Sequence, residues 1–538
     1  MKDDSIMKDD SLVIAHFREP TDPYLEQADD KDDNVDPSVP LKYRGTSFDK
    51  REMKMLGKTQ VLRRNFKFVA MLGFASTVMA SWEILLPLFT FVLIDGGPAL
   101  LFWGLIVCSI GMTCVYASIA EMASMSPTSG GQYHWVSEFA PRRIQKFLSY
   151  FVGWLTTIGW QVYLAGICFM TGSTIQGLIA LNVKYYIWHQ YHGTLLTIAV
   201  IVFSIAFNTI FAAKLPLLEA VVLFLHFCGL FAVVIPLWVL GPRAPAHETL
   251  LTFQNNGGWS SVGLSSMIGL TTPLSVLVGY DCSVHMSEEI QDASTTLPKA
   301  ILGSILVNGT LSFIMGITLI FTLGDINSLL NSVTRQPFIQ QFYNATHSYG
   351  ATNTMVAIVV ILMSASCISE VATSSRQIWA FARDRGLPGS LWLSKVTPGW
   401  NIPLHAVGVS LVVASAIACI NIGSTTALNA INSCGSVSIQ TSYIITIGCL
   451  VNKRLRGEPL PPRRWSLGKY GLYINIASIL FLLPLWFFSF WPLAIPVDAE
   501  TMNWASTMFG GVLILAMFYY VIRARNVYKG PVVQMKRE

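Results

Sequence analysis

Charged residues are scarce in this sequence. Only 12% of its 538 residues are Asp, Glu, Lys or Arg, whereas roughly 25% is typical of a soluble domain. Hydrophobic residues make up 52% of the chain, and they are grouped in blocks of about 20 residues, each long enough to cross a hydrocarbon core about 30 Å thick. These proportions exclude a soluble multidomain protein. The net charge of +5 is small, and the basic residues form short clusters between the apolar blocks, so we expect no nucleic-acid partner.

Paired cysteines and targeting signals are also lacking. All nine cysteines lie inside apolar blocks, without a CxxC pair, which argues against a disulfide framework or a zinc site. The HxxH pair of His189 and His192 has no carboxylate or cysteine beside it, so we expect no metal and no cofactor. Residues 1–62 are polar and contain no apolar signal-peptide core, and we expect them to form a disordered cytosolic tail.

The apolar blocks predict an all-α integral membrane protein with twelve transmembrane helices. The predicted spans are 68–94, 98–122, 147–180, 193–213, 216–240, 259–284, 300–323, 353–376, 403–423, 426–450, 471–496 and 504–522. An even number places both termini on one side of the membrane. The loops of one face carry only three basic residues, Lys184, Arg243 and Arg335, so the other face and both termini are predicted to be cytosolic.

The spans divide into four predicted regions: a tail over 1–62, a ten-helix transport core over 63–450, two peripheral helices over 451–523 and a C-terminal cytosolic tail over 524–538. The core divides further into one repeat over about 66–240 and a second over about 258–450. The predicted external loop 324–352 contains the sequon Asn344-Ala345-Thr346, so Asn344 is a candidate glycosylation site.

Two predicted spans, the first and the sixth, are not uniform apolar helices. Small and polar residues gather between Gly73 and Glu83, while Pro273 and Gly279 interrupt the sixth span. In transporters with five-plus-five inverted repeats, the first helix of each repeat is discontinuous and lines the substrate site. Half-helix N-termini would offer free N–H groups to a carboxylate. The alternative, that Gly and Pro only kink two packing helices, stays open at this stage.

Ionisable residues within spans normally face a cavity or a partner, because burying a charge in lipid is costly. Asp281 is the leading candidate: it could bind a substrate amine or carry a proton, or else serve as a structural hydrogen-bond hub. Tyr280 could stack on a cationic amine or be an ordinary core aromatic. Glu83 fits a binding role and a buried structural pair equally well.

Three more ionisable residues have two interpretations each. Glu370 could carry a proton, although its sequence position favours a structural pair with Arg376. His226, the only histidine deep within a predicted span, could couple transport to protons or simply pack. Glu219 is close to Lys214, which favours an interfacial ion pair.

Three motifs, in order, resemble the amino acid-polyamine-organocation (APC) permeases. They are Tyr116–Met122 with Ser126–Tyr133, Val278–Glu289 with Leu297–Ile301, and Ser374–Pro388. The closest subgroup is that of fungal amino acid/choline transporters, which includes GABA and choline permeases. The resemblance covers roughly residues 65–525 and implies the LeuT-type 5+5 inverted repeat with broken first and sixth helices.

The same resemblance bears on two positions. It places His226 where many family members carry a lysine in the fifth span. It aligns the family's Gly-Ser-Gly signature with Ala80, Ser81 and Trp82, so the bulk of Trp82 is expected to reshape the pocket.

These observations predict a proton-coupled permease for an amino acid or a related small amine, such as GABA or a choline-like cation. The predicted substrate-binding residues are Ser76, Thr77, Ala80, Ser81, Trp82, Glu83, Gly279, Tyr280 and Asp281, and the proton-coupling candidates are Asp281, His226 and Glu370. The expected driving force is the proton gradient, and the plasma membrane is preferred to the vacuolar membrane. Export of a specialised amine metabolite and a non-transporting nutrient sensor are the alternatives. No cluster of catalytic residues at one membrane face supports an enzyme.

Overall fold

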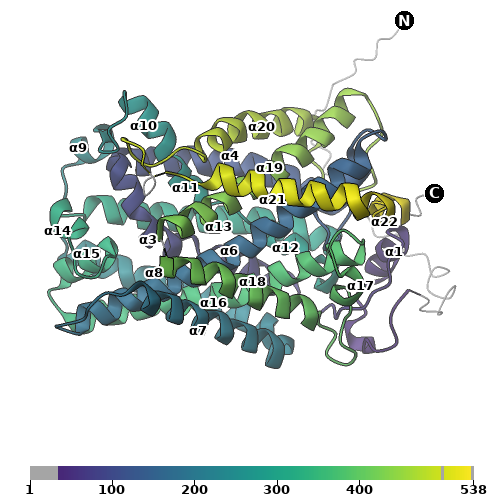
Figure 1. The fold of residues 1–538 in the computed structure, drawn as a ribbon, viewed down its shortest axis with the longest axis horizontal. Helices are drawn as coiled ribbons and strands as arrows, with labels where there is room; N and C mark the ends of the chain where they lie inside the picture. Colours follow the sequence, from purple (N-terminus) through teal and green to yellow (C-terminus); the bar gives the residue numbers. More distant parts are fainter. Residues whose placement is uncertain (1–33, 424, 499–501, 535–538) are drawn as a thin grey trace, which may run out of the picture.

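The chain forms a bundle of long helices that run roughly side by side along the longest axis of the molecule (Figure 1). The computed structural model describes residues 34–423, 425–498 and 502–534. Its long helices are α2 (Phe68–Met79), α3 (Ser81–Ile94), α4 (Gly97–Met125), α6 (Gln145–Asn182), α7 (Gln190–Ile210), α8 (Leu215–Leu240), α13 (Ala293–Phe321), α16 (Tyr349–Arg383), α18 (Leu404–Gly423), α19 (Thr425–Leu455), α20 (Gly471–Phe488) and α21 (Ala505–Tyr519).

The remaining α-helices are shorter. They are α1 (Ser47–Met55), α5 (Gln132–Phe139), α9 (Ala246–Leu251), α10 (Val262–Gly269), α11 (Thr271–Ser275), α12 (Cys282–His285), α14 (Ile326–Leu330), α15 (Pro337–Thr346), α17 (Ser390–Leu393) and α22 (Arg525–Val527). Helices α1, α17 and α22 lie at one end, which we call the terminal face, and α9, α14 and α15 lie at the other, the opposite face (Figure 1).

Eleven helical segments in the described part of the chain are long and apolar enough to cross a membrane. They correspond to all the predicted spans except the sixth. The sixth span contains no single helix long enough to cross a membrane, because it consists of α10, α11 and α12 with non-helical residues between them. Outward-facing side chains such as Phe224, Leu306 and Ile361 are exposed and apolar, as expected for a multi-pass protein whose surface is covered by lipid.

Both predicted breaks are present. The first span is interrupted at Ala80, which has a φ of 37° and separates α2 from α3. In the sixth span, helix α11 ends at Ser275 and α12 begins at Cys282; between them Gly279 has a φ of 114°. A short antiparallel pair, β1 (Asp95–Gly96) and β2 (Gln254–Asn255), connects the end of α3 to the segment before α10. The two broken spans are therefore held together at the opposite face.

The prediction that residues 1–62 form a disordered tail is wrong for its second half, while residues 1–33 lie outside the described residues. Helix α1 begins with a capping box between Thr46 and Asp49. The side chain of Arg64 is buried, pairs with Asp49 at 3.2 Å and donates to the carbonyl oxygen of Ile290 at 2.6 Å. Residues 34–66 are thus anchored to the terminal face by polar contacts and isolated apolar side chains, which a search for long apolar blocks does not detect.

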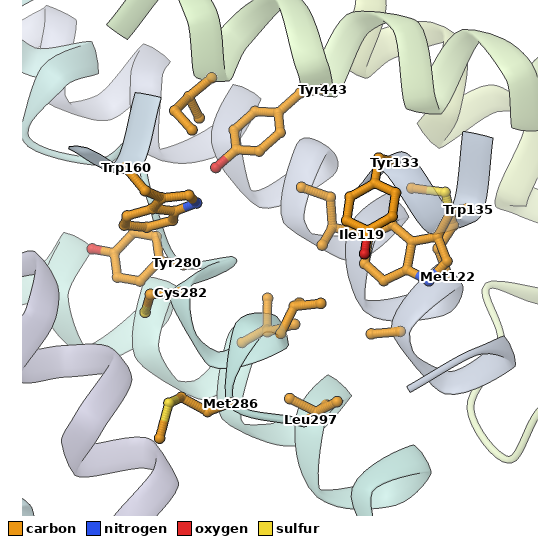
Figure 2. Close-up of a cluster of buried hydrophobic side chains, with 14 of the residues drawn as sticks. Ile119, Met122, Tyr133, Trp135, Trp160, Tyr280, Cys282, Met286, Leu297 and Tyr443 are labelled. Atoms are coloured by element: carbon orange, nitrogen blue, oxygen red, sulfur yellow. The ribbon is translucent and has the colours of Figure 1, made fainter. Parts of the chain in front are cut away.

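The core contains two clusters of buried apolar side chains. One surrounds α4, α5, α12 and the start of α13, and Figure 2 shows part of it, with Trp160, Tyr280 and Tyr443 grouped on one side and Tyr133 and Trp135 on the other. The second cluster packs α3 against α8, α13 and α16. The breaks lie where the two clusters meet, because Met79 belongs to the first cluster and Trp82 to the second.

Candidate functional site

The two breaks face each other in the middle of the bundle. The hydroxyls of Ser81 and Tyr280 are 2.9 Å apart. A Cβ added at Gly279 would lie 2.6 Å from the terminal methyl carbon of Met79. The last residue of α2 therefore sits directly against the non-helical part of the sixth span.

At the sixth break, one tyrosine satisfies the backbone. The hydroxyl of Tyr116 accepts hydrogen bonds from the N–H groups of Gly279 at 2.7 Å and Tyr280 at 3.3 Å, and it donates to the carbonyl oxygen of Leu277 at 3.0 Å. Because buried backbone groups need partners, this side chain from α4 allows the helix to remain open. It also occupies the N–H groups that a substrate carboxylate would otherwise reach.

Asp281 is fully buried just before α12. It accepts hydrogen bonds from the amide of Gln132 and from the hydroxyl of Tyr443. The Nε2 of His285, one turn later, is 3.7 Å from Asp281 Oδ2. The other ring nitrogen, Nδ1, is 3.0 Å from the carbonyl oxygen of Ser129, which can only accept, so Nδ1 carries a hydrogen.

The arrangement of His285 and Asp281 has a consequence for protons. With its hydrogen on Nδ1, a neutral imidazole presents a bare Nε2 to a carboxylate, and two acceptors then face each other. Either a protonated His285 or a protonated Asp281 removes this repulsion.

At the first break the backbone is satisfied differently. Asn308 donates to the carbonyl oxygen of Ser76 at 3.1 Å, and the hydroxyl of Ser366 donates to that of Val78 at 2.7 Å. The first N–H groups of α3 have no hydrogen-bond partner among the described residues; they belong to Ser81, Trp82 and Glu83. These donors, at the positive end of the helix dipole, suit an anion.

Glu83 and His226 form a buried pair. His226 Nδ1 is 2.7 Å from Glu83 Oε1, and its Nε2 is 3.2 Å from Asn308 Oδ1. The indole N–H of Trp82 donates to the carbonyl oxygen of His226 at 3.2 Å. Trp82 thus points toward α8. It does not line the cavity described below, and the expectation that it reshapes the substrate pocket stays a prediction.

Two predicted ion pairs are absent from the described residues. Arg376 binds Glu289, with Nε 2.7 Å from Oε1, because it lies more than one and a half helical turns closer than Glu370 to the terminal face. Glu219 is fully buried and accepts a hydrogen bond of 2.6 Å from Ser369. Its side chain faces α16, away from the surface where Lys214 lies.

A cavity of about 430 Å³ extends from the breaks toward the opposite face. Its inner end includes Met79, Val278 and Glu370, and its outer end includes Ile94 and Trp491. None of the nine predicted substrate-binding residues lines it: Ser76, Thr77, Ala80, Ser81, Trp82, Glu83, Gly279, Tyr280 and Asp281. Met79, which does line the cavity, lies directly over one of them, Gly279.

The terminal face is closed by buried ion pairs. Arg383 binds Glu288 through two contacts of 2.6 and 2.8 Å, and Lys58 lies 3.6 Å from Asp384. Burial raises the pKa of Glu288, but the guanidinium of Arg383 outweighs it and holds that pKa at about 2. The pairs of Arg383 with Glu288 and of Arg376 with Glu289 connect α16 to the segment that follows the sixth span. The pair of Lys58 with Asp384 connects the end of α16 to the segment before α2.

Sequence reasoning missed four polar residues around Asp281: Tyr116, Gln132, His285 and Tyr443. His285 was overlooked because it falls one residue beyond the predicted span, although its spacing of four from Asp281 is typical of one helical face. The other three come from distant helices: Tyr116 and Gln132 lie in the family motifs given above, whereas Tyr443 lies in none of them. Asn344 lies in α15, where its amide donates to Ser328 at 2.9 Å; its glycosylation stays a prediction.

Comparisons with known proteins agree with this architecture. The profile of the amino acid permease family matches residues 66–515. An uncharacterized amino-acid permease of Schizosaccharomyces pombe is 29% identical over 90% of this chain and 89% of its own. Amino-acid permease 2 of Neurospora crassa is 27% identical over 90% of each chain, and the choline transporter of Saccharomyces cerevisiae is 26% identical over 87% of this chain and 83% of its own.

Membership of this family indicates a transporter rather than an enzyme, in agreement with a bundle whose centre holds two opposed helix breaks. The chain belongs to the amino acid permease family of the APC superfamily, and it is a multi-pass transmembrane transporter.

Proposed function

We propose that this protein is a proton-coupled permease for an amino acid or a small amine of the GABA or choline type. The observation that carries the proposal is the pairing of the two breaks, one with free N–H donors and the other with a buried carboxylate. A zwitterion carries the complementary pair of groups. The names of the relatives, amino-acid permeases and a choline transporter, support this substrate class.

In the proposed central site, the substrate carboxylate binds the N–H groups of Ser81, Trp82 and Glu83, while its ammonium binds near Asp281. Ser76, Thr77 and Ala80 shape the end of α2, and Gly279 and Tyr280 shape the facing break. Met79 must move before a substrate reaches these groups, since it lies over Gly279. A substrate with a quaternary amine and no carboxylate would use the Asp281 side alone.

Proton coupling is assigned to the buried ionisable groups. Asp281 with His285 forms one site that holds a proton, and His226 with Glu83 forms another. Glu370 is a third candidate, because it is buried and faces the cavity. A proton bound at any of these sites reduces the cost of moving a buried charge through the bundle.

The proposed orientation places the terminal face in the cytosol and the cavity toward the exterior, with the plasma membrane as the location. The cavity then belongs to an outward-facing state, and the ion pairs of Glu288, Glu289 and Asp384 form the closed cytosolic gate. Alternating access requires these pairs to break while the β1–β2 side closes.

Uptake by proteoliposomes tests this function. The purified protein is reconstituted, and uptake of labelled GABA, choline and a panel of amino acids is measured with and without an inward proton gradient. We expect one class of compound to enter the vesicles faster when the inward proton gradient is present. Without the proton gradient, the same compound should enter more slowly, driven only by its own concentration gradient. Equal uptake with and without the proton gradient would contradict proton coupling, and no uptake of any compound would contradict the substrate class.

A further inference from the structure

The cavity contains a single ionisable side chain. Among the residues that line it, Glu370 is the only Asp, Glu, Lys, Arg or His in the described part of the chain. Glu370 is 2% exposed, and its Oε2 has no hydrogen-bond partner among the described residues. A buried carboxylate oxygen without a donor is costly, and a cation in the cavity would remove that cost.

The rest of the lining is apolar with a few hydroxyls. Four aromatic side chains contribute, Phe91, Tyr163, Phe488 and Trp491, together with aliphatic residues of α3 and α6. Hydroxyls come from Thr271, Thr272, Ser275, Ser433, Ser436 and Ser489. Apolar walls with a few placed polar groups are typical of small-molecule sites, and aromatic faces attract ammonium groups.

The size of the cavity narrows the class of ligand. A volume of about 430 Å³ lies within the range of roughly 300–1,000 Å³ that is typical of small-molecule pockets. GABA and choline each have only seven non-hydrogen atoms, so either would leave part of the space empty. An amine with an aromatic or branched aliphatic body fills it better.

We propose that this cavity binds amines with an apolar body, and that Glu370 is the group that binds the ammonium. Asp281 is not available in this conformation, because Gln132 and Tyr443 both donate to it and it does not line the cavity. Acidic substrates are rejected, since the cavity offers them a carboxylate and no basic side chain. This proposal rests on the proposed function in one respect: it takes the cavity to be the path by which a substrate enters the protein.

Binding of 2-phenylethylamine to the full chain in lipid nanodiscs, without any gradient, tests the proposal. We expect wild-type protein to bind 2-phenylethylamine and to show no competition by glutamate. Glu370→Gln keeps the shape but removes the charge, and it should weaken binding about tenfold or more, because a bond to a charged group is lost. The matched control is Glu248→Gln, which makes the same change at an exposed position of the opposite face and should bind as wild type does.

Unchanged affinity in Glu370→Gln, or competition by glutamate equal to that by 2-phenylethylamine, would overturn the proposal. Should Glu370→Gln fail to fold, Leu88→Trp supplies a second test, because Leu88 lines the cavity and the larger side chain narrows it. We expect Leu88→Trp to weaken the binding of 2-phenylethylamine more than the binding of trimethylamine, which is the smaller amine. An equal effect on both amines would contradict a site matched to an apolar body.

Uptake by proteoliposomes from the same preparations separates the two proposals. Proton-driven uptake that Glu370→Gln leaves unchanged would refute the cavity site and leave the proposed function standing. Binding of 2-phenylethylamine through Glu370, without uptake of any compound, would support the cavity site and refute transport.

Discussion

The first and the sixth spans are both broken at the centre of the bundle, but by different means. The first break turns at Ala80, a residue with a side chain in the left-handed region, and leaves the leading N–H groups of α3 without partners in the described structure. The sixth break turns at Gly279, and its N–H groups are bound by Tyr116. One break therefore presents backbone donors and the other presents a side-chain carboxylate, Asp281.

This difference explains how one centre can suit a zwitterion. Free N–H groups at a helix start attract an anion without any charged side chain. At the facing break the same groups are already used, so recognition there depends on the side chain that follows. The carboxylate of a substrate would bind backbone N–H groups, and its ammonium would bind a side-chain carboxylate. Substitutions at the two breaks should therefore differ in how much they reduce uptake.

Gly279→Val should have the largest effect. Backbone strain at a φ of 114° costs about 1–3 kcal/mol for a residue with a side chain, and a β-branched residue is least tolerant of positive φ. The new side chain would also displace Met79, whose methyl carbon lies 2.6 Å from the Cβ position. We expect uptake by proteoliposomes to fall to background and the melting temperature to drop.

The control for this substitution is Gly263→Val in α10, where an added Cβ meets no atom within 4 Å. This variant should keep most of its uptake, because the position is open and helical. Equal loss in both variants would mean that the sixth span tolerates no branched residue anywhere, and the special role of Gly279 would be refuted.

Asp281→Asn should be the next most severe change. Gln132 and Tyr443 both donate to the carboxylate, and an asparagine offers one acceptor oxygen and one donor group in its place. We expect proton-driven uptake to fall about a hundredfold, because one bond to a charged group is lost and the other loses its charge. The measurement is initial uptake at a fixed proton gradient, with reconstituted protein quantified in each vesicle preparation.

Glu83→Gln is the matched change at the first break, and it should reduce uptake less. A glutamine oxygen can still accept from His226, so the buried contact is partly kept. If Glu83→Gln were the more damaging of the two, the carboxylate that matters most would belong to the first break and the comparison would be reversed.

Tyr116→Phe should have an intermediate effect. Loss of the hydroxyl leaves two N–H groups and one carbonyl oxygen of the sixth break without their partner, and each unsatisfied buried group costs about 1–3 kcal/mol. We expect a clear drop in thermal stability, measured by unfolding of the purified protein in detergent. Ser366→Ala removes a single bond to the first break and should cost about 1 kcal/mol; equal losses in the two variants would show that Tyr116 does not support the open helix.

The sequence predicted the breaks better than the site around them. Small residues between Gly73 and Glu83, and Gly279 in the sixth span, are local signals, because backbone preference depends on the residue itself. The uninterrupted helices followed from apolar length, but some of their ends did not: α20 ends at Phe488 where the predicted span runs to 496, and α16 runs to Arg383 where the predicted span ends at 376. By contrast, Glu219 and Glu370 were assigned neighbours along the chain, whereas their surroundings depend on which helix face is buried.

The polar groups that surround Asp281 show the same limit. Gln132, Tyr116 and Tyr443 come from three different helices, and no local pattern states that they converge. The pairing of His226 with Glu83 also joins two distant spans, although both residues were candidates for their rarity in apolar segments. Rarity identifies ionisable residues that need a partner, but only tertiary packing identifies the partner.

Ala80→Gly should have the smallest effect. Unlike the other substitutions, it should relieve backbone strain and so raise the free energy of unfolding. A left-handed conformation costs alanine about 1–2 kcal/mol, which glycine does not incur. Glycine also gains conformational freedom in the unfolded chain, which lowers stability by about 0.4–1 kcal/mol. The net change should be a gain of about 1 kcal/mol or less, seen as a slightly raised melting temperature with uptake retained. A marked loss of uptake would instead show that Ala80 holds the free N–H groups of α3 in position, so that the first break, like the sixth, depends on one side chain.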